Sequence, residues 1–409
     1  MSDPTLAITN GRLILPNGSI ADGASLAMTG DRISAIGKGI TTLHAIDAGG
    51  HYVAPGIIDL GVFAIDKPAF HFGGITRAAV MPDQNPPLDH PARVRFVAQS
   101  GKPDFWVHPL GGATRELAGV EMAELALMQD AGARGVATGR GWIADSGTML
   151  RLMQYCAALD LPLFVHSEDQ GLTGKAVATD GEMALRLGLA SAPAEAEAIA
   201  IARDLALVRL SGAQVHFRQV TTRAGLALIR AAKAEGLPVT CGITPAHFML
   251  SDVALGGFRT FARLSPPLRS EDDRQAALEA LADGTIDVIA SGHDPRGPED
   301  KRLPFADAEP GMAGAETLLA LTLNLVRDKV LTLGDAIARL TSNPAAILGV
   351  EAGQLAQGME ADIMVFEMDR PWIVDSAKME AAAGNTPFDK MPVQGRVTHL
   401  LKGGKEIAL

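Results

Sequence analysis

The stretch AQVHFRQVTTRAGLALIRAAKAEGLPVTCGIT, residues 213–244, decides the fold. It begins and ends with an apolar run of strand length, AQVHFRQV (213–220) and LPVTCGIT (237–244). Between these runs, RAGLALIRAAKAEG (223–236) has apolar residues at helical spacing and closes on glycine, as helices often do. A strand, a helix and a second strand in this order are typical of a parallel β/α unit, whose strands are buried on both faces.

The same alternation of apolar runs and amphipathic helices continues in both directions along the chain. Helical patterns include residues 116–132, 147–159, 194–212, 271–284 and 315–330. Eight strands alternating with helices predict an α/β fold, a (β/α)₈ TIM barrel. The eight runs of strand length are residues 53–60, 75–82, 105–110, 134–139, 161–167, 213–220, 237–244 and 286–292.

The two ends of the chain have a different pattern. Residues 4–48, 352–368 and 393–408 alternate apolar and polar side chains, which is typical of antiparallel strands. We expect the two ends to meet as one small β-sandwich, joined to the barrel by the helical segment 335–349. The predicted parts are residues 1–53 and 351–409 for the sandwich and residues 54–350 for the barrel.

The first β/α unit, beginning with GIIDLGVFAIDKP (56–68), is unusually short. Only GVFAIDKPAFHFGG (61–74) separates the first two strands, and it shows no amphipathic turn. A parallel crossover normally takes a dozen or more residues and a helix. We therefore predict that the first outer helix of the barrel is missing or shortened.

Composition excludes several classes of function. The net charge is −11 and only 4% of residues are aromatic, which argues against nucleic-acid binding. No apolar run is long enough to cross a membrane, and the first residues do not form a signal-peptide pattern. Cys156 and Cys241 lie far apart and outside any CxxC motif, so we expect buried thiols in a cytoplasmic protein.

Chemistry in such barrels lies at the C-terminal ends of the strands. A catalytic zinc ion needs about three His or carboxylate ligands. His166 and His293 are candidates, with Asp294 or Asp59, but no two histidines have the i, i+2 spacing that points them the same way. The residues favour structural roles instead, with His166 hydrogen-bonded in a polar pocket and Asp59 anchoring a loop.

A series of motifs, in order along nearly the whole chain, is similar to those of dihydroorotases, which are cyclic-amide hydrolases of the amidohydrolase superfamily. They include APGIIDL, MPDQNPPLD, FVHSEDQ, DGTIDVIASGHDP, LTSNPAAILG and NTPFDKMPVQGRV. The resemblance implies a (β/α)₈ barrel with a β-sandwich from both chain ends. It also implies zinc-assisted hydrolysis, in which the metal activates a water and an aspartate on strand eight takes the proton.

The positions that hold metal, move protons or bind substrate in that family mostly carry residues that cannot do so here. By the resemblance, Gly61 and Phe63 stand where the family has the HxH pair of strand one, and Thr138 and Gly139 stand where it has the acidic pair of strand four. Gln219 replaces the histidine of strand six, and Gly292 replaces the aspartate of strand eight. Of the substrate-binding positions, Ile65 replaces the arginine that binds the substrate carboxylate, and Asp83 replaces an asparagine. Of the metal and proton-transfer positions, only the histidine of strand five remains, as His166.

We therefore expect no catalytic residues and no zinc or other cofactor. If a metal binds, the expected ligands are His166, His293 and Asp294. Phe63 is expected to pack inward where a metal would lie. The expected residual pocket comprises His166, Asp83, Asn85, Arg269 and His293, of which Arg269 and Asn85 are candidates to position a small anionic ligand.

Three functions follow from this pattern. The leading one is a non-catalytic subunit, because the chain resembles the inactive dihydroorotase-like subunits that assemble with aspartate carbamoyltransferase in pyrimidine synthesis. That resemblance implies a hetero-oligomer. The alternatives are an active zinc-dependent dihydroorotase with a rebuilt metal site, and a module whose pocket senses a pyrimidine intermediate.

Overall fold

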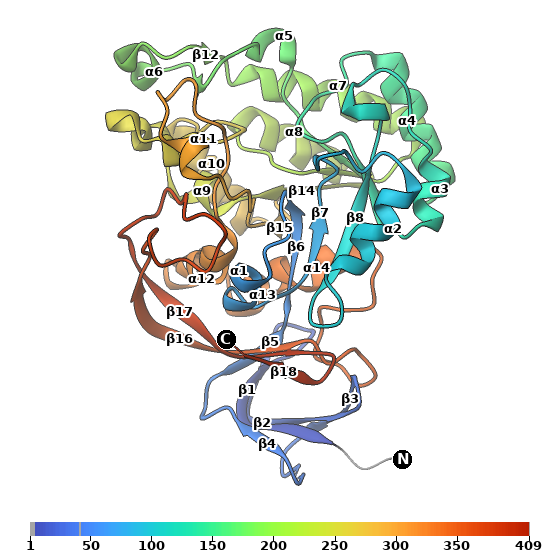
Figure 1. The fold of residues 1–409 in the computed structure, drawn as a ribbon, viewed down its shortest axis with the longest axis vertical. Coiled ribbons are helices and arrows are strands. Elements are labelled where there is room, and N and C mark those ends of the chain that lie inside the picture. The colour runs from blue at the N-terminus through green and yellow to red at the C-terminus, as the bar shows by residue number, and fades with distance from the viewer. Residues whose placement is uncertain (1–4, 41, 409) are drawn as a thin grey trace.

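Eight parallel strands form the barrel, and their order in the sheet follows their order in the sequence. The computed structural model describes residues 5–40 and 42–408 (Figure 1). Each of the eight predicted runs overlaps a barrel strand, and all but one of these strands are shorter than the run that predicted them. They are β6 (Ile57–Val62), β7 (Ile75–Val80), β8 (Trp106–Gly112), β9 (Gly135–Ala137), β10 (Leu163–Val165), β13 (Val215–Phe217), β14 (Val239–Ile243) and β15 (Val288–Ile289).

Helices cover the outside of the barrel. Several begin at a capping side chain that accepts a backbone N–H of the first turn, such as Asp145, Thr222 and Ser270. The longer helices are α2 (Pro91–Ser100), α3 (Leu125–Asp130), α4 (Ser146–Ala158), α7 (Glu195–Ser211), α8 (Arg223–Ala234), α10 (Glu271–Ala282), α12 (Leu318–Arg327), α13 (Leu333–Leu340) and α14 (Ser342–Ile347).

Short elements surround the C-terminal ends of the strands, at the top of Figure 1. They make the connections on the side of the barrel where chemistry is expected. They include α5 (Gln170–Thr173), β11 (Ala178–Thr179), α6 (Glu182–Leu187), β12 (Ser191–Ala192), α9 (Pro245–Met249), α11 (Pro298–Lys301) and the 3₁₀ segments η2 (Asp252–Phe258), η3 (Thr260–Ala262) and η4 (Ala315–Thr317).

One prediction about a helix needs correction, and another is decided between its two alternatives. The helix predicted over residues 116–132 is wrong in its first half, because Glu116 and Leu117 have positive φ angles and only α3 is an α-helix there. The first outer helix is shortened rather than missing. It is α1 (Lys67–Phe72), and its buried Phe70 packs against the ring of Phe105 with centroids 4.9 Å apart.

The predicted strand 53–60 is divided at Gly56 between two sheets. Residues before Gly56 form β5 (Tyr52–Pro55), which belongs to the sheet of the chain ends, and residues after it form β6 of the barrel. A Cβ atom at Gly56 would lie 2.4 Å from Cγ2 of Thr76. A glycine is therefore needed where the chain passes from one sheet to the other.

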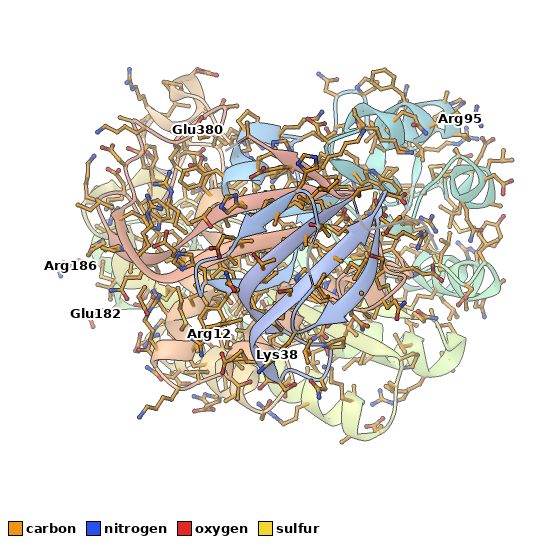
Figure 2. The ribbon with its side chains drawn as sticks, turned by 90° about the horizontal axis from the view of Figure 1, so that it is seen from below. Arg12, Lys38, Arg95, Glu182, Arg186 and Glu380 are labelled. Carbon is orange, nitrogen blue, oxygen red and sulfur yellow. The ribbon has the colours of Figure 1, made fainter. Side chains whose placement is uncertain are left out.

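Strands from both chain ends meet in one sheet, as predicted. It lies across the base of the barrel (Figure 2) and encloses its own apolar cluster, which includes Leu13, Leu26 and Val365. The order is β18-β17-β16-β5-β1-β2-β3, with β4 beside β1. The remaining bounds are β1 (Leu6–Ile14), β2 (Ile20–Thr29), β3 (Arg32–Gly37), β4 (Ala45–Asp47), β16 (Ile363–Ile373), β17 (Pro392–Lys402) and β18 (Lys405–Ile407).

Two further expectations concern the whole chain. Cys156 and Cys241 are free and buried, as expected of small apolar residues. Burial raises the pKa of the Cys156 thiol to about 12. In the part of the chain that the structure describes, none of the helices combines the length and the apolar character needed to cross a membrane.

The barrel closes between its two edge strands, β6 and β15, through two contacts outside the regular strand pairing. The N–H of Phe63 donates to the carbonyl of His293 at 2.8 Å, and the N–H of Ser291 donates to Oδ1 of Asp59 at 2.9 Å. Asp59 is fully buried, and burial raises its pKa to about 6. Asp59 thus anchors the segment after β15, consistent with the structural role expected for it.

Asp59→Asn should change how stability depends on pH. Folded Asp59 keeps its proton up to about pH 6, whereas an unfolded aspartate loses it near pH 4. The folded state therefore binds more protons between these values, and this group makes stability fall as pH rises from about 4 to about 6. Relative to wild type, the free energy of unfolding of Asp59→Asn should rise by about 2–3 kcal/mol between pH 4 and pH 7.

Urea unfolding of both proteins at the two pH values measures this difference. Asp130→Asn, at an exposed position, is the matched control. It should change the free energy of unfolding by the same amount at both pH values. If the difference in free energy of unfolding between Asp59→Asn and wild type is also independent of pH, Asp59 ionises normally in the folded protein.

Candidate functional site

The candidate site is a cleft at the C-terminal ends of the barrel strands, with an outer and an inner part that share Arg140, Leu264 and Ser265. The outer part has a volume of about 400 Å³. The inner part is much smaller, about 20 Å³. Side chains lining the outer part include His166, Glu168, Gln170 and Arg263, and those lining the inner part include Phe63, Arg218, Gln219, Thr244 and Asp294.

Phe63 packs inward, as expected, and two arginines cover its ring. The Phe63 residue is 8% exposed. Cζ of Arg140 lies 3.7 Å from the ring centroid and Cζ of Arg218 lies 5.0 Å from it. A guanidinium over an aromatic face is an attractive cation–π contact, worth more when it is shielded from water. The inner part of the cleft is thus filled by an aromatic ring and two cations.

Arg218, at the end of β13, is the main residue of the site that the sequence analysis missed. It is 5% exposed, and its Nη2 lies 3.3 Å from Nδ1 of His166. Burial lowers its pKa to about 10, so it still carries its charge at neutral pH. The available signal was a charged residue next to the buried run VHF, at the end of a barrel strand.

Arg218 and Gly61 compete for the same space. A Cβ atom at Gly61 would lie 3.2 Å from Cδ of Arg218, and Gly61 has a φ of +86°, which disfavours any other residue. A histidine at position 61 would therefore crowd the Arg218 side chain and strain the backbone. The first position of the HxH pair is thus unfavourable for any residue but glycine while Arg218 lies where it does.

His166 lies in a polar pocket, as expected. Its Nε2 is 3.2 Å from Oε2 of Glu168, and its backbone N–H donates to Oγ1 of Thr138 at 3.1 Å. Burial by itself would raise the pKa of Glu168. The hydrogen bond from His166 and the charge of Arg269 outweigh burial, and they lower the pKa of Glu168 to about 2. The histidine that remains from the family pattern is therefore engaged by a carboxylate on one side and by Arg218 on the other.

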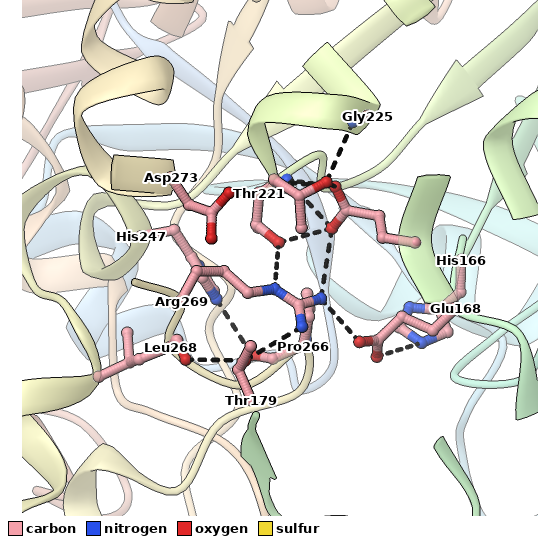
Figure 3. A network of polar contacts seen from close by, with 12 residues as sticks. His166, Glu168, Thr179, Thr221, Gly225, His247, Pro266, Leu268, Arg269 and Asp273 are labelled. Atoms are coloured by element: carbon pink, nitrogen blue, oxygen red, sulfur yellow. Dashed lines mark hydrogen bonds and ion pairs between the residues drawn. The ribbon is translucent and has the colours of Figure 1, made fainter. Parts of the chain in front are cut away.

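Arg269 lies behind the cleft in a buried network (Figure 3). Its Nε donates to Oγ1 of Thr221 at 2.9 Å, and its Nη2 donates to Oε1 of Glu168 at 2.8 Å. The same Nη2 lies 3.4 Å from Oε2 of Glu197, and Nη1 donates to Thr179. The expectation that Arg269 positions an anionic ligand is corrected, because these contacts engage its nitrogens inside the protein.

The other residues of the expected pocket are not all brought together. Asp83 lies beside the site, where its Oδ1 accepts the backbone N–H of Arg140 at 2.9 Å. Asn85 is exposed and lines neither part of the cleft. His293 is fully buried and turned toward α1, with its Nε2 3.4 Å from Oδ2 of Asp66.

The remaining positions of the family pattern have ordinary packing roles. Ile65 packs against the barrel core, and Gln219 and Gly292 line the inner part of the cleft. Gly139 lies so close to Asp83 that a Cβ atom would be 2.9 Å from its Oδ1.

The alternative metal ligands His166, His293 and Asp294 are wrong as a set. His293 is turned toward Asp66, and Oδ2 of Asp294 accepts from Nη2 of Arg140 at 2.7 Å. Among residues 5–40 and 42–408, no three His, Cys, Asp or Glu side chains are grouped so that they could hold a metal ion.

Phe63 and the two arginines over it do not fit zinc, the metal that the resemblance implies. The other candidate ligands of the inner cleft are engaged, His247 by Thr244 and Pro266 and Asp294 by Arg140. Zinc needs nitrogen, oxygen or sulfur atoms with a free electron pair. Phe63 has no such atom, and the guanidinium groups of Arg140 and Arg218 are only hydrogen-bond donors. Two guanidinium charges at this place would also repel a divalent cation.

Comparison with known proteins places the chain in a family. The model of the Amidohydrolase family matches residues 33–407. The chain is 38% identical to a dihydroorotase of Syntrophotalea carbinolica over 419 aligned residues, covering 98% of each chain. It is 35% identical to a dihydroorotase of Anaeromyxobacter dehalogenans, covering 99% of this chain and 98% of the other.

Solved structures agree with this placement. An L-hydantoinase from Arthrobacter aurescens superposes with a TM-score of 0.88 at 27% identity, covering 99% of this chain and 96% of the other. A dihydropyrimidinase from Brevibacillus agri shares the fold, with a TM-score of 0.83 at 21% identity, covering 98% of this chain and 94% of the other. The barrel with its sheet from both chain ends is thus the fold of these proteins. The chain belongs to the amidohydrolase family, and the two relatives compared with it above are named dihydroorotase.

Proposed function

We propose that this chain is a non-catalytic member of the dihydroorotases, acting in pyrimidine biosynthesis as an assembly partner of aspartate carbamoyltransferase. The observation that carries the non-catalytic part is the pairing of Gly61 with Arg218. The aliphatic part of the buried Arg218 side chain lies against Gly61, where a Cβ atom would be 3.2 Å from Cδ, so a ligand at position 61 would be crowded and its backbone strained. The partner follows from the resemblance to dihydroorotase-like subunits that lack metal ligands.

The replacements in the cleft support one another. Phe63 provides an aromatic face for Arg140 and Arg218, Asp294 pairs with Arg140, and Gly61 leaves room for Arg218. The centre is packed with these contacts, which supports loss of the metal chemistry.

The rest of the barrel is well packed, which supports a role for its shape. The core extends through all eight strands and the outer helices, and residues such as Phe70, Phe105 and Phe217 are fully buried. A scaffold needs a rigid surface but no reactive group. The proposal implies an oligomer in the cytoplasm, and free cysteines fit a reducing compartment.

Co-expression with the aspartate carbamoyltransferase of the same organism tests the proposal. The two proteins should elute together from size exclusion, with a mass by light scattering above that of either protein alone. The transferase expressed alone serves as the control and should form a smaller assembly. A transferase whose assembly and activity are the same with and without this chain would rule the partnership out.

An active dihydroorotase is the second candidate, and one observation favours it. Relatives named dihydroorotase cover 98% of the chain and are up to 38% identical to it. The chain also has His166. This candidate predicts stoichiometric zinc and ring opening that depends on His166.

A further inference from the structure

We propose that Arg203 and Asp204 form a pH-sensitive latch on the segment that carries Arg140 into the cleft. This segment, residues 139–145, connects β9 to α4. The guanidinium of Arg140 covers the ring of Phe63, so whatever holds the segment also sets how the inner cleft is closed. The latch is independent of the assembly role proposed above.

Arg203 fastens the second half of the segment to α7. Its Nη1 donates to the carbonyl of Ile143 at 2.8 Å and to that of Ala144 at 3.3 Å. Its Cζ lies 4.2 Å from the centroid of the Trp142 ring, which is a cation–π contact. One side chain of α7 thus contacts three consecutive residues of the segment.

Asp204 holds Arg203 from a buried position. It lies on the buried face of α7, one helical turn from Ala200 on one side and from Val208 on the other. Its Oδ1 accepts from Nε of Arg203 at 2.7 Å, and its Oδ2 is buried without a hydrogen-bond partner among the described residues. A carboxylate in apolar surroundings is costly to keep ionised, because burial penalises the charged form. The charge of Asp204 therefore depends on a single contact.

The charge of Asp204 changes within the ordinary range of pH. Burial raises its pKa to about 7, and the charge of Arg203 offsets burial only in part. Above this pH the carboxylate is ionised and accepts a charge-assisted hydrogen bond, which weakens when the group is protonated. The Arg203 side chain is 16% exposed, so its guanidinium can turn toward water once its counter-ion is neutral. The segment then loses the hydrogen bonds to its carbonyls and the cation over Trp142.

Charged groups on the elements packed against α7 have other partners. The charged residue of α4 is Arg151, which donates to Thr148. Asp145 also attracts Arg203, but it is exposed and caps α4. Three cations of α8 pair with acids outside α7, and these pairs are Arg223 with Asp272, Arg230 with Asp283 and Lys233 with Asp287. Protonation of Asp204 therefore leaves Arg203 without its buried counter-ion.

The backbone around Arg140 is able to respond to this change. Gly139 has a φ of +77°, and Gly141 follows Arg140 directly. Glycine adopts a wider range of backbone conformations than any other residue. Ile143 stays anchored, because its side chain is 2% exposed and belongs to the barrel core. We therefore expect a local adjustment of residues 139–142 and not the release of the whole connection.

Tryptophan fluorescence of the full chain tests the latch. Trp142 is one of three tryptophans, and the difference between the wild type and Trp142→Phe isolates its signal. Because the guanidinium leaves the ring, quenching of Trp142 by acrylamide should rise about twofold as pH falls from 8.5 to 5.5. The midpoint should lie near pH 7. Quenching of Trp142 that stays constant over this range would overturn the proposal.

Variants identify the group that titrates. Asp204→Asn is neutral at every pH and should show the low-pH quenching throughout, without a transition. Asp130→Asn, at an exposed position on α3, is the matched control and should keep the transition. Arg203→Met should also lose the transition, and since Arg203 is partly exposed, this variant keeps the test valid if Asp204→Asn fails to fold. A transition near pH 7 that persists in either latch variant would overturn the proposal.

Discussion

Purified without chelators and supplied with zinc, the chain should open the dihydroorotate ring no faster than protein-free buffer. Its kcat/KM should lie at least ~10⁴-fold below the values of typical enzymes. This is the largest effect that we predict. The measurement is the loss of dihydroorotate absorbance, together with metal analysis of the same sample.

The size of the effect follows from two independent losses. Without a metal, no hydroxide is generated at neutral pH, because bound zinc is what lowers the pKa of water from 15.7 to about 7. Without an acid or base at position 292, a further factor of roughly 10²–10⁴ from proton transfer is lost. Gly292 has no side chain, and Phe63 lies beside the guanidinium of Arg218 where the resemblance implies a metal ligand.

His166→Ala is the control for this assay. If the chain is inactive, the variant and the wild type should give the same background rate. Stoichiometric zinc and a turnover that disappears in His166→Ala would instead establish a working hydrolase and overturn the non-catalytic proposal.

Arg269→Met should lower the free energy of unfolding by about 3–5 kcal/mol, the largest effect on stability that we predict. Arg269 is 4% exposed, and its removal would leave Glu168 and Glu197 buried without their cation. Glu197 is itself 1% exposed and accepts from the backbone and hydroxyl groups of Thr221 and Thr222, which begin the connection after β13.

Chemical unfolding monitored by circular dichroism measures this change. Arg209→Met is the matched control, because Arg209 makes a bidentate pair with Glu235 on the surface, where such pairs contribute at most about 1 kcal/mol. Adding Glu168→Gln to Arg269→Met should recover part of the loss, since it removes one of the two uncompensated charges. A loss below about 1 kcal/mol for Arg269→Met would contradict the importance of this network.

Most of the fold could be predicted from the sequence, because its signals are local. Apolar runs such as residues 237–244 became strands and amphipathic patterns such as residues 223–236 became helices. The helix expected over residues 116–132 failed in its first half, where Glu116 adopts a backbone conformation that apolar periodicity does not reveal. The short α1 was hidden because six residues give too little periodicity to recognise.

The candidate site was predictable only in part. The absence of ligands at positions such as Gly61 and Phe63 can be read from residue type alone. The direction in which a side chain points cannot be read from residue type. His293 follows a barrel strand, as a ligand would, but it turns toward Asp66, and Arg269 turns to Glu168 and Glu197.

The sequence by itself therefore determined the barrel and the sheet built from both chain ends, and the proposed loss of the family's metal ligands also rests on it. Each of these depends on residue type and on spacing along the chain. The tertiary structure alone decided what surrounds Gly61 and Phe63. Phe63 and Arg218 are separated by more than a hundred positions in the chain, and only the closing of the barrel brings the guanidinium over the ring and beside Gly61. Steric exclusion and electrostatic pairing act over a few ångströms in space, so they depend on folded positions that no local pattern records.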